Sequence, residues 1–432
     1  MSVLSRLKAD TAGNTAMIFA LCLPVLLALV GGAIDFSRAT QLRMELQDAA
    51  DTAALGAIAV NSLGYKAGSN MAGNGTISDG VDQALSILKT NIGTHTDLSA
   101  ISPAATVTKT GHTLTAKVTV TANYKPYLLG LVGFSNIPLN AMSVSTAGLP
   151  PYINFYLLLD NTPSMGVGAT TADINKMVAN TPDKCAFACH QMDKAGNDYY
   201  AKAKTLGVTT RIDVVRQATQ NLMTTAKASQ TTPGQYGMAI YHFGMAADAI
   251  DEKKPEPYLI SDLTTNLDAS AANAAAIDLM TIPYQNYNSD RQTNFKSMLQ
   301  GMNKIIPSSG DGTSANKPQQ VLFLVSDGAN DGYDCAYSNG GTCRRISPID
   351  PQQCHTIKAR GVRIAVLYTT YLPLPTNAFY NQHLAKYQSQ LATEMEACAS
   401  PGLFFEVSPS QGISDAMSAL FTRVVSVVRI KN

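Results

Sequence analysis

The sequence predicts an α/β head domain with a mostly parallel sheet, attached to a helix long enough to span a membrane. After Pro150-Pro151, strand-like and helix-like segments alternate, which is typical of a parallel sheet covered by helices on both faces. The segment 16–34 carries no charge, and its length is about that of a membrane-spanning helix. Residues 64–149 combine helical and alternating strand patterns, so we expect a small α+β module between the two.

The N-terminal region predicts a retained anchor with its N-terminus in the cytoplasm. Residues 1–15 contain Arg6 and Lys8 ahead of the apolar segment, and Asp35 follows it, a bias that favours a cytoplasmic N-terminus. A cleavable signal peptide is the alternative. The apolar segment is long for such a peptide and ends without a clear small-x-small cleavage site. We therefore expect a single transmembrane helix over 16–34.

Residues 35–63 continue the helical pattern. Leu42, Leu46, Ala49 and Ala53 recur at spacings of three or four residues, so they share one face of a helix. This helix either lies on its own domain or forms a stalk that contacts partner proteins near the membrane. We take the stalk as the working hypothesis.

Three stretches of this region have a distinctive sequence. Gly13–Ala16, Gly32–Arg38 and Leu46–Leu55 read GNTA, GAIDFSR and LQDAADTAAL. They resemble the TadE/TadG-type N-terminus of Tad (Flp) pilus assembly proteins. Pseudopilins of this system are cleaved after a Gly and carry a Glu a few residues later, whereas Asn-Thr-Ala-Met-Ile follows Gly13 here. The resemblance implies an uncleaved, TadG-like protein of the bacterial inner membrane, with its head in the periplasm or exposed beyond it.

The module at 64–149 shows no catalytic constellation. Residues 64–80 are rich in Gly, Asn and Ser and predict a loop. Residues 81–92 predict an amphipathic helix. The alternating segment 105–120 predicts a hairpin that turns at Gly111-His112, and 141–147 predicts a further strand.

The head, residues 150–432, follows a regular order of elements. The expected strands are 153–159, 236–243, 320–326, 362–369 and 403–407, with a further strand near Tyr258-Leu259-Ile260. The expected helices are 211–228, 294–306, 351–360, 378–398 and 412–428. Two insertions, 169–210 and 331–350, interrupt this order.

Oxygen-bearing side chains follow the first strand of the head. Asp160, Thr162 and Ser164 stand at alternate positions directly after the apolar run 155–159. In an open α/β sheet, ligands bind where parallel strands end, and hard oxygen donors suit Mg²⁺, Mn²⁺ or Ca²⁺. The segment therefore predicts a site for a divalent cation.

Two later positions extend this pattern. Thr293 precedes a predicted helix, and Asp327-Gly328 follows a second buried strand. Together with Asp160, Thr162 and Ser164, they resemble the metal site of von Willebrand factor A domains, with Thr162 in the first Ser place of the D-x-S-x-S motif. The resemblance implies a Rossmann-like binding domain whose Mg²⁺ (or Mn²⁺ or Ca²⁺) receives an acidic side chain of a partner. The partner would be another pilus assembly or envelope protein.

The cysteines indicate an oxidising compartment. Cys22 lies in the apolar segment, while the other six lie in the head, which suggests disulfides. We expect the pairs Cys185–Cys189, Cys335–Cys343 and Cys354–Cys398, although six cysteines allow many connectivities. The sequence CAFACH at 185–190 has one residue too many between its cysteines for a haem c site, and no paired C-x₂-C spacing supports zinc.

Two alternatives to a metal-dependent binding protein remain open. Asp160 after a strand, with Asp327 and Asp331, has some likeness to haloacid-dehalogenase-type phosphotransferases. Thr162 stands where that family has its acid, so the proton donor is missing. The second alternative is a structural envelope protein with a vestigial metal site. We expect Asp331 and Asp334 to be loop residues rather than ligands. The net charge of +1 gives no reason to expect nucleic acid as a partner.

Overall fold

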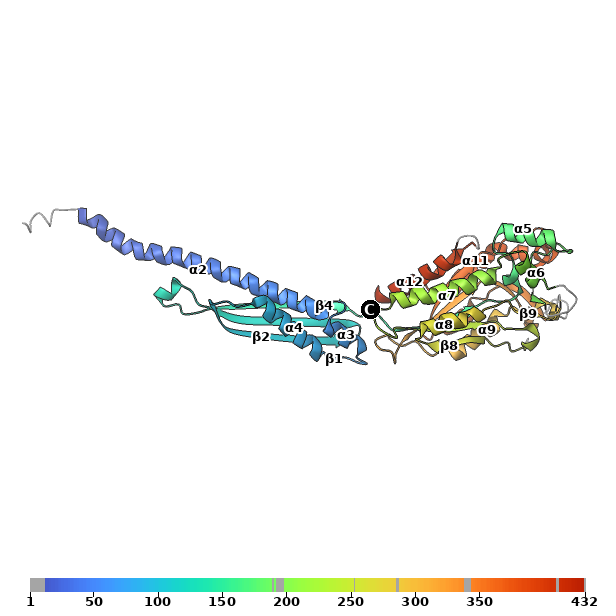
Figure 1. Ribbon diagram of the computed structural model, residues 1–432, viewed down its shortest axis with the longest axis horizontal. Helices are drawn as coiled ribbons and strands as arrows, with labels where there is room; N and C mark the ends of the chain where they lie inside the picture. The colour runs from blue at the N-terminus through green and yellow to red at the C-terminus, as the bar shows by residue number, and fades with distance from the viewer. Residues whose placement is uncertain are drawn as a thin grey trace, which may run out of the picture. The chain divides into compact units, whose positions relative to one another are not determined.

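The computed structural model divides the chain into two compact units, Met1–Leu149 and Pro150–Asn432 (Figure 1). The described residues are 12–188, 190–191, 198–251, 253–284, 287–337, 343–408 and 412–430.

One continuous helix, α2, runs from Ala12 to Ile58 in the first unit. It contains both the uncharged segment 16–34 and most of the predicted stalk. Among the described residues, it is the one helix long and apolar enough to cross a membrane. The side chains of its apolar part are exposed, whereas Leu42, Leu46 and other small or apolar side chains further along are buried.

A four-stranded antiparallel sheet receives the buried face of α2. Its strands, in spatial order, are β1 (Gly75–Thr76), β2 (Leu98–Thr110), β3 (Thr113–Tyr124) and β4 (Ile137–Gly148). Helices α3 (Leu63–Asn70) and α4 (Ser78–Ile92) complete the unit, and the short 3₁₀ helix η1 (Leu129–Val132) lies between β3 and β4. The hairpin turns at Gly111, whose φ is +59°, as predicted. Ala49 and Ala53 share one core with Val118 and Leu88, so the helix lies on its own domain and does not form a separate stalk.

The predicted loop over 64–80 contains helix α3. Ser62 begins this helix by accepting a hydrogen bond from the Tyr65 N–H at 3.0 Å. Gly64 then lies against the backbone of Gly80. Gly64 and Gly80, two of the glycines that suggested a loop, are in fact sites of close packing.

The head is built around a six-stranded sheet, and this confirms the predicted fold class. Its spatial order is β14-β13-β10-β5-β7-β8. The parallel strands are β5 (Ile153–Leu159), β7 (Tyr236–His242), β10 (Gln319–Ser326), β13 (Arg363–Thr369) and β14 (Phe404–Val407). The edge strand β8 (Tyr258–Thr264) is antiparallel to β7, as expected for the segment near Leu259.

Helices cover both faces of this sheet because its central strands are apolar on both sides. One core joins the sheet to α7 (Arg211–Ser229), α8 (Leu267–Asn273) and α12 (Ile413–Ile430). The other core joins it to α9 (Phe295–Ile305), α10 (Gln352–Lys358) and α11 (Gln388–Cys398). Within the predicted helix 378–398, a π-helical turn (Tyr380–Leu384) and a 3₁₀ turn (Ala385–Tyr387) precede α11.

The insertions have their own short elements. The first contains α5 (Thr171–Asn180), β6 (His190–Gln191) and α6 (Tyr199–Thr205), and β6 pairs with β9 (Thr281–Ile282). The second is largely a hairpin of β11 (Ala329–Tyr333) and β12 (Arg344–Pro348). Short 3₁₀ turns lie at Pro163–Gly166, Ala247–Ala249, Ala274–Ala276, Tyr287–Asp290 and Cys335–Tyr337.

Two of the expected disulfides are present. Cys335 pairs with Cys343 across the second insertion. Cys354 pairs with Cys398 and joins α10 to α11. Cys185 instead has a free, buried thiol that donates to the Phe187 carbonyl at 3.6 Å, so the expected Cys185–Cys189 bridge is not shown; Cys189 lies outside the described residues.

Candidate metal centre

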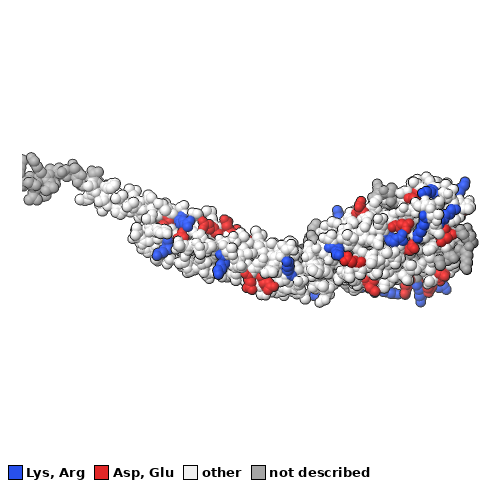
Figure 2. Space-filling view, in the orientation of Figure 1, with Lys and Arg blue, Asp and Glu red and all other residues white. Residues whose placement is uncertain are grey.

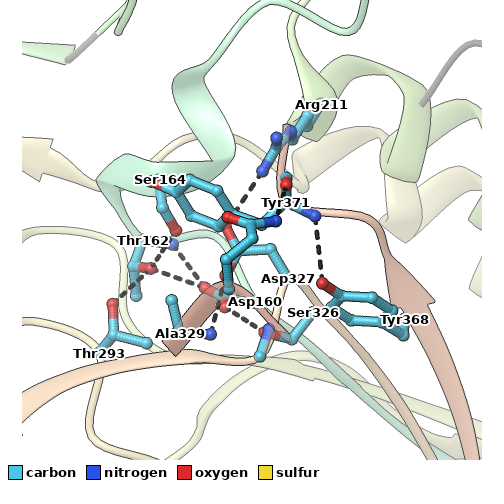
Figure 3. Close-up of polar contacts among 12 residues, drawn as sticks. Asp160, Thr162, Ser164, Arg211, Thr293, Ser326, Asp327, Ala329, Tyr368 and Tyr371 are labelled. Carbon is cyan, nitrogen blue, oxygen red and sulfur yellow. Dashed lines mark hydrogen bonds and ion pairs between the residues drawn. The ribbon is translucent and has the colours of Figure 1, made fainter. Parts of the chain in front are cut away.

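The five candidate ligands come from three segments that meet at the carboxyl end of the head sheet. β5 and β10 are parallel neighbours, so the residues that follow them, Asp160 and Asp327, lie side by side. The loop before α9 brings Thr293 to the same place (Figure 3). Sites at this edge are common in open α/β sheets because adjacent loops diverge there.

Asp160 is the centre of a hydrogen-bond network. One carboxylate oxygen accepts from the backbone N–H and the hydroxyl of Thr162, at 3.0 and 2.7 Å. The other accepts from the Ser326 hydroxyl at 2.7 Å. Because both oxygens are held by donors from two neighbouring strands, the carboxylate has a fixed orientation (Figure 3).

The three hydroxyls lie next to one another beside this carboxylate. Thr293 Oγ1 donates to Thr162 Oγ1 at 2.7 Å. The oxygens of Thr162 and Ser164 are 3.5 Å apart. Ser164 also hydrogen-bonds to the carboxylate of Asp327. The structure therefore brings all five predicted residues into one continuous cluster of oxygen atoms.

Thr293 is positioned by its backbone. Its N–H donates to the Asp331 carbonyl and its carbonyl accepts from the Asp331 N–H, each at 2.9 Å. Asn294 then caps α9 by accepting from the Ser297 N–H. This pairing with the second insertion holds the loop against the end of the sheet.

Asp331 and Asp334 form ion pairs within the second insertion. Asp331 forms an ion pair with Arg344, and Asp334 forms one with Arg345 at 3.3 Å. Asp331 lies in strand β11 rather than in a loop. Both carboxylates stabilise the hairpin of the second insertion.

Arg211 also contacts the cluster, and the sequence did not predict this contact. Its guanidinium donates to Asp327 at 3.1 Å, and both side chains are fully buried. Within the described part of the chain, Nε and the second terminal nitrogen of Arg211 have no hydrogen-bond partner. The guanidinium also lies over the Tyr371 ring, 5.1 Å from its centroid. The only sequence signal was a charged residue at the start of a helix that follows an insertion.

Burial controls the electrostatics of the two carboxylates. Burial raises the pKa of Asp160, the nearby charge of Asp327 raises it further, and hydrogen bonds from Ser326 and Thr162 oppose both effects. Burial likewise raises the pKa of Asp327, against the opposite effect of Arg211. Two buried carboxylates with one guanidinium leave a net negative charge, which a bound cation would neutralise.

These residues fit a hard divalent cation. Carboxylate and hydroxyl oxygens are ligands for Mg²⁺, Mn²⁺ and Ca²⁺. The described residues contain no group of three or more His, Cys, Asp or Glu side chains that suits a metal, so a site here depends on the hydroxyls. Asp160, Thr162 and Asp327 are fully buried, whereas Ser164 is partly exposed and marks the accessible side.

The first insertion is attached next to the loop that bears Ser164. Val167 bridges to Phe187 and Gly168 bridges to Thr210, so the insertion starts and ends beside the cluster. The Arg211 N–H donates to the Val167 carbonyl at 3.0 Å. The loop that bears Ser164 is therefore fastened to the N-terminus of α7.

Comparison with known families finds a match within the first unit. Residues 13–61 match the model of the family described as putative Flp pilus-assembly TadE/G-like. This segment of the chain is TadE/G-like. It covers the apolar part of α2 and the part that packs on the small sheet. No curated protein matches the chain.

Solved structures similar to the chain include proteins of pili and of a mussel thread. The von Willebrand factor domain of the type V pilus tip protein Mfa5 from Porphyromonas gingivalis is 11% identical, with a TM-score of 0.37, covering 66% of this chain and 97% of that one. The pilus adhesin SpaC from Lactobacillus rhamnosus GG is 10% identical, with a TM-score of 0.36, covering 77% and 34%. Proximal thread matrix protein 1 from the mussel byssus, solved with a zinc-occupied MIDAS motif, is 11% identical, with a TM-score of 0.34, covering 65% and 46%.

Proposed function

We propose that this protein is an inner-membrane component of Tad/Flp pilus assembly whose head binds partner proteins through a divalent cation. The observation that carries the proposal is the convergence of Asp160, Thr162, Ser164, Thr293 and Asp327 at one edge of the head sheet. The TadE/G-like segment at 13–61 supports the assignment to pilus assembly. We propose no enzymatic activity.

The ion supplies a positive centre that accepts a carboxylate oxygen from a partner. Thr162, Ser164 and Thr293 would hold it, with Asp160 and Asp327 bound directly or through water. Mg²⁺ suits this donor set best, with Mn²⁺ or Ca²⁺ as alternatives. Three of the five donors are neutral, so the ion keeps enough charge to attract an acidic side chain.

Residues around the candidate ligands hold the two carboxylates in fixed positions without a bound ion. Ser326 and the Thr162 N–H fix the Asp160 carboxylate. Arg211 holds Asp327 in place and offsets part of its charge. This preorganisation lowers the cost of ordering the ligands when the ion binds.

The head belongs on the far side of the membrane from the N-terminus. Arg6 and Lys8 precede the apolar segment and favour the cytoplasm. The disulfides Cys335–Cys343 and Cys354–Cys398 of the head are typical of the periplasm or the cell surface.

A structural protein with a vestigial metal site is the second candidate. It is favoured by the ion pair between Arg211 and Asp327, because this pair already compensates one of the two carboxylates. The phosphotransferase alternative is weakened by Asp331, whose carboxylate forms an ion pair with Arg344.

Pilus assembly in the native bacterium separates these candidates. We expect Asp160→Ala and Asp327→Ala to abolish both assembly and magnesium-dependent capture of envelope proteins by the full-length protein. Asp268→Ala is the matched control, since Asp268 is exposed and pairs with Lys227 on the surface. Normal assembly with both site variants would show that the metal site is vestigial.

A further inference from the structure

The connection between β3 and β4 carries an exposed apolar surface. We call residues 127–134, with the sequence YLLGLVGF, the apolar loop. Tyr127 is 71% exposed, Leu131 83% and Phe134 59%. No charged residue occurs between Lys125 and Asp160. Large apolar side chains gathered on a protein surface indicate a binding surface for a partner or a membrane.

The apolar loop is fastened to helix α2. The carboxylate of Asp35 accepts the backbone N–H groups of Tyr127, Leu128 and Leu129 at 3.0, 2.8 and 2.7 Å. It also accepts the Tyr124 hydroxyl at 3.0 Å. Four donors on one buried carboxylate hold the start of the loop in a defined position.

Two glycines of α2 let the loop approach the helix closely. A Cβ added at Gly31 would lie 2.8 Å from Leu128 Cβ, and one added at Gly32 would lie 3.4 Å from Leu129 Cδ2. The loop therefore contacts the last turn of the uncharged segment 16–34, and Figure 1 shows it beside α2 at the end of the small sheet.

The position of this contact on α2 determines the depth of the apolar loop relative to a membrane. A helix rises about 1.5 Å per residue, so 16–34 spans the roughly 30 Å of a bilayer's hydrocarbon core. Gly31 and Gly32 then lie within about one helical turn of its boundary. Figure 2 shows no charged side chain on the visible face of this part of α2.

We propose that the apolar loop inserts into the lipid leaflet at the C-terminal end of the membrane helix. The proposal rests on the proposed membrane anchor. Leu131 and Phe134 would enter the acyl region, while Tyr127 suits the interface, where aromatic rings with a polar group accumulate. The bilayer is the occupant because the loop continues the membrane-facing surface of α2 at the same level. This second contact restricts rotation of the first unit about its own helix.

Tryptophan fluorescence tests this insertion without a signal from native tryptophan, because the chain contains no Trp. Leu131→Trp and Phe134→Trp are introduced singly into the full-length protein, which is reconstituted in vesicles of phosphatidylcholine with or without brominated acyl chains. Leu29→Trp, in the apolar helix, reports whether the anchor is in the membrane. Met142→Trp is the matched control: Met142 is 55% exposed, and its carbonyl accepts from Gln47, several turns beyond the boundary.

We expect bromolipid to quench the loop probes and the Leu29 probe, with blue-shifted emission, and to leave the Met142 probe unquenched. Quenching at Leu29 without quenching at either loop position would overturn the insertion while leaving the anchor intact; the loop would then be a surface for a protein partner. If the Leu29 probe also stays unquenched, the anchor fails and the insertion fails with it. Circular dichroism confirms that each variant is folded.

Discussion

Arg211 is the residue on which the state of the proposed metal centre depends most. It is buried beside Asp327, and among the described residues two of its nitrogens lack a hydrogen-bond partner. The guanidinium pairs with Asp327, and a divalent cation at the proposed site would compensate the same carboxylate. In the absence of metal, the arginine therefore supplies more of the positive charge that compensates Asp327 than it does when metal is bound.

Replacing Arg211 should make the head depend on metal for stability. We expect Arg211→Met to lower the free energy of unfolding by about 3 kcal/mol without metal, because a buried carboxylate loses its partner. Magnesium should restore more stability to this variant than it adds to the wild type. Arg211→Lys, which keeps the charge, is the control, and urea unfolding with EDTA or Mg²⁺ measures both. Equal responses of Arg211→Met and wild type to magnesium would contradict this role.

His242 gives the head a dependence on pH through a residue that is not a candidate ligand. It is fully buried at the end of β7, and burial lowers its pKa to about 4. The folded protein keeps it neutral, whereas the unfolded chain protonates it near its usual pKa of 6.5. Its contribution to stability is therefore full above pH 6.5 and is lost as the pH falls toward 4.

Removing the imidazole should remove this acid sensitivity. We expect the free energy of unfolding of the wild type to fall between pH 6.5 and 4 relative to His242→Phe, by up to about 1.4 kcal/mol per pH unit. Urea unfolding across this range provides the comparison. Parallel pH profiles for the two proteins would show that His242 is protonated in the folded head.

At the scale of elements, the sequence predicted the strands of the head better than the helices of the module. The strands β5, β10 and β13 are continuous apolar runs bounded by polar residues, and the short length of these runs favours a buried strand over a helix. Helix α3 was missed because Gly64 and Gly68 serve close packing, which depends on distant residues.

The packing of α3 can be tested with two glycines of the same predicted loop. A Cβ at Gly64 would lie 2.2 Å from the Ala57 carbonyl oxygen and 2.9 Å from Gly80 Cα, both backbone atoms, whereas one at Gly73 would meet nothing within 4 Å. We expect Gly64→Ala to destabilise the first unit by about 2 kcal/mol through overpacking. Gly73→Ala should stay within about 0.5 kcal/mol of the wild type. Denaturant unfolding of the two variants measures this difference, and equal stabilities would show that α3 does not pack closely.

At the scale of the whole molecule, the features with a proposed function are distributed over both units. The first contains the TadE/G-like segment and the apolar loop, and the second contains the candidate metal centre. The meeting of the five candidate ligands could be predicted from the sequence, because each lies just after a strand or before a helix and the pattern resembles a known metal site; metal binding by them stays a prediction. The contacts of Arg211 and Ser326 with the two carboxylates could not be found, because they join segments far apart in the chain.

Binding of Mn²⁺ to the full-length protein, followed by electron paramagnetic resonance, tests the central proposal most directly. We expect saturable binding of Mn²⁺ that Mg²⁺ competes for, with an affinity at least about tenfold weaker in Asp160→Asn and Asp327→Asn but unchanged in Asp268→Asn. Absence of saturable binding, or equal binding by all four proteins, would contradict it.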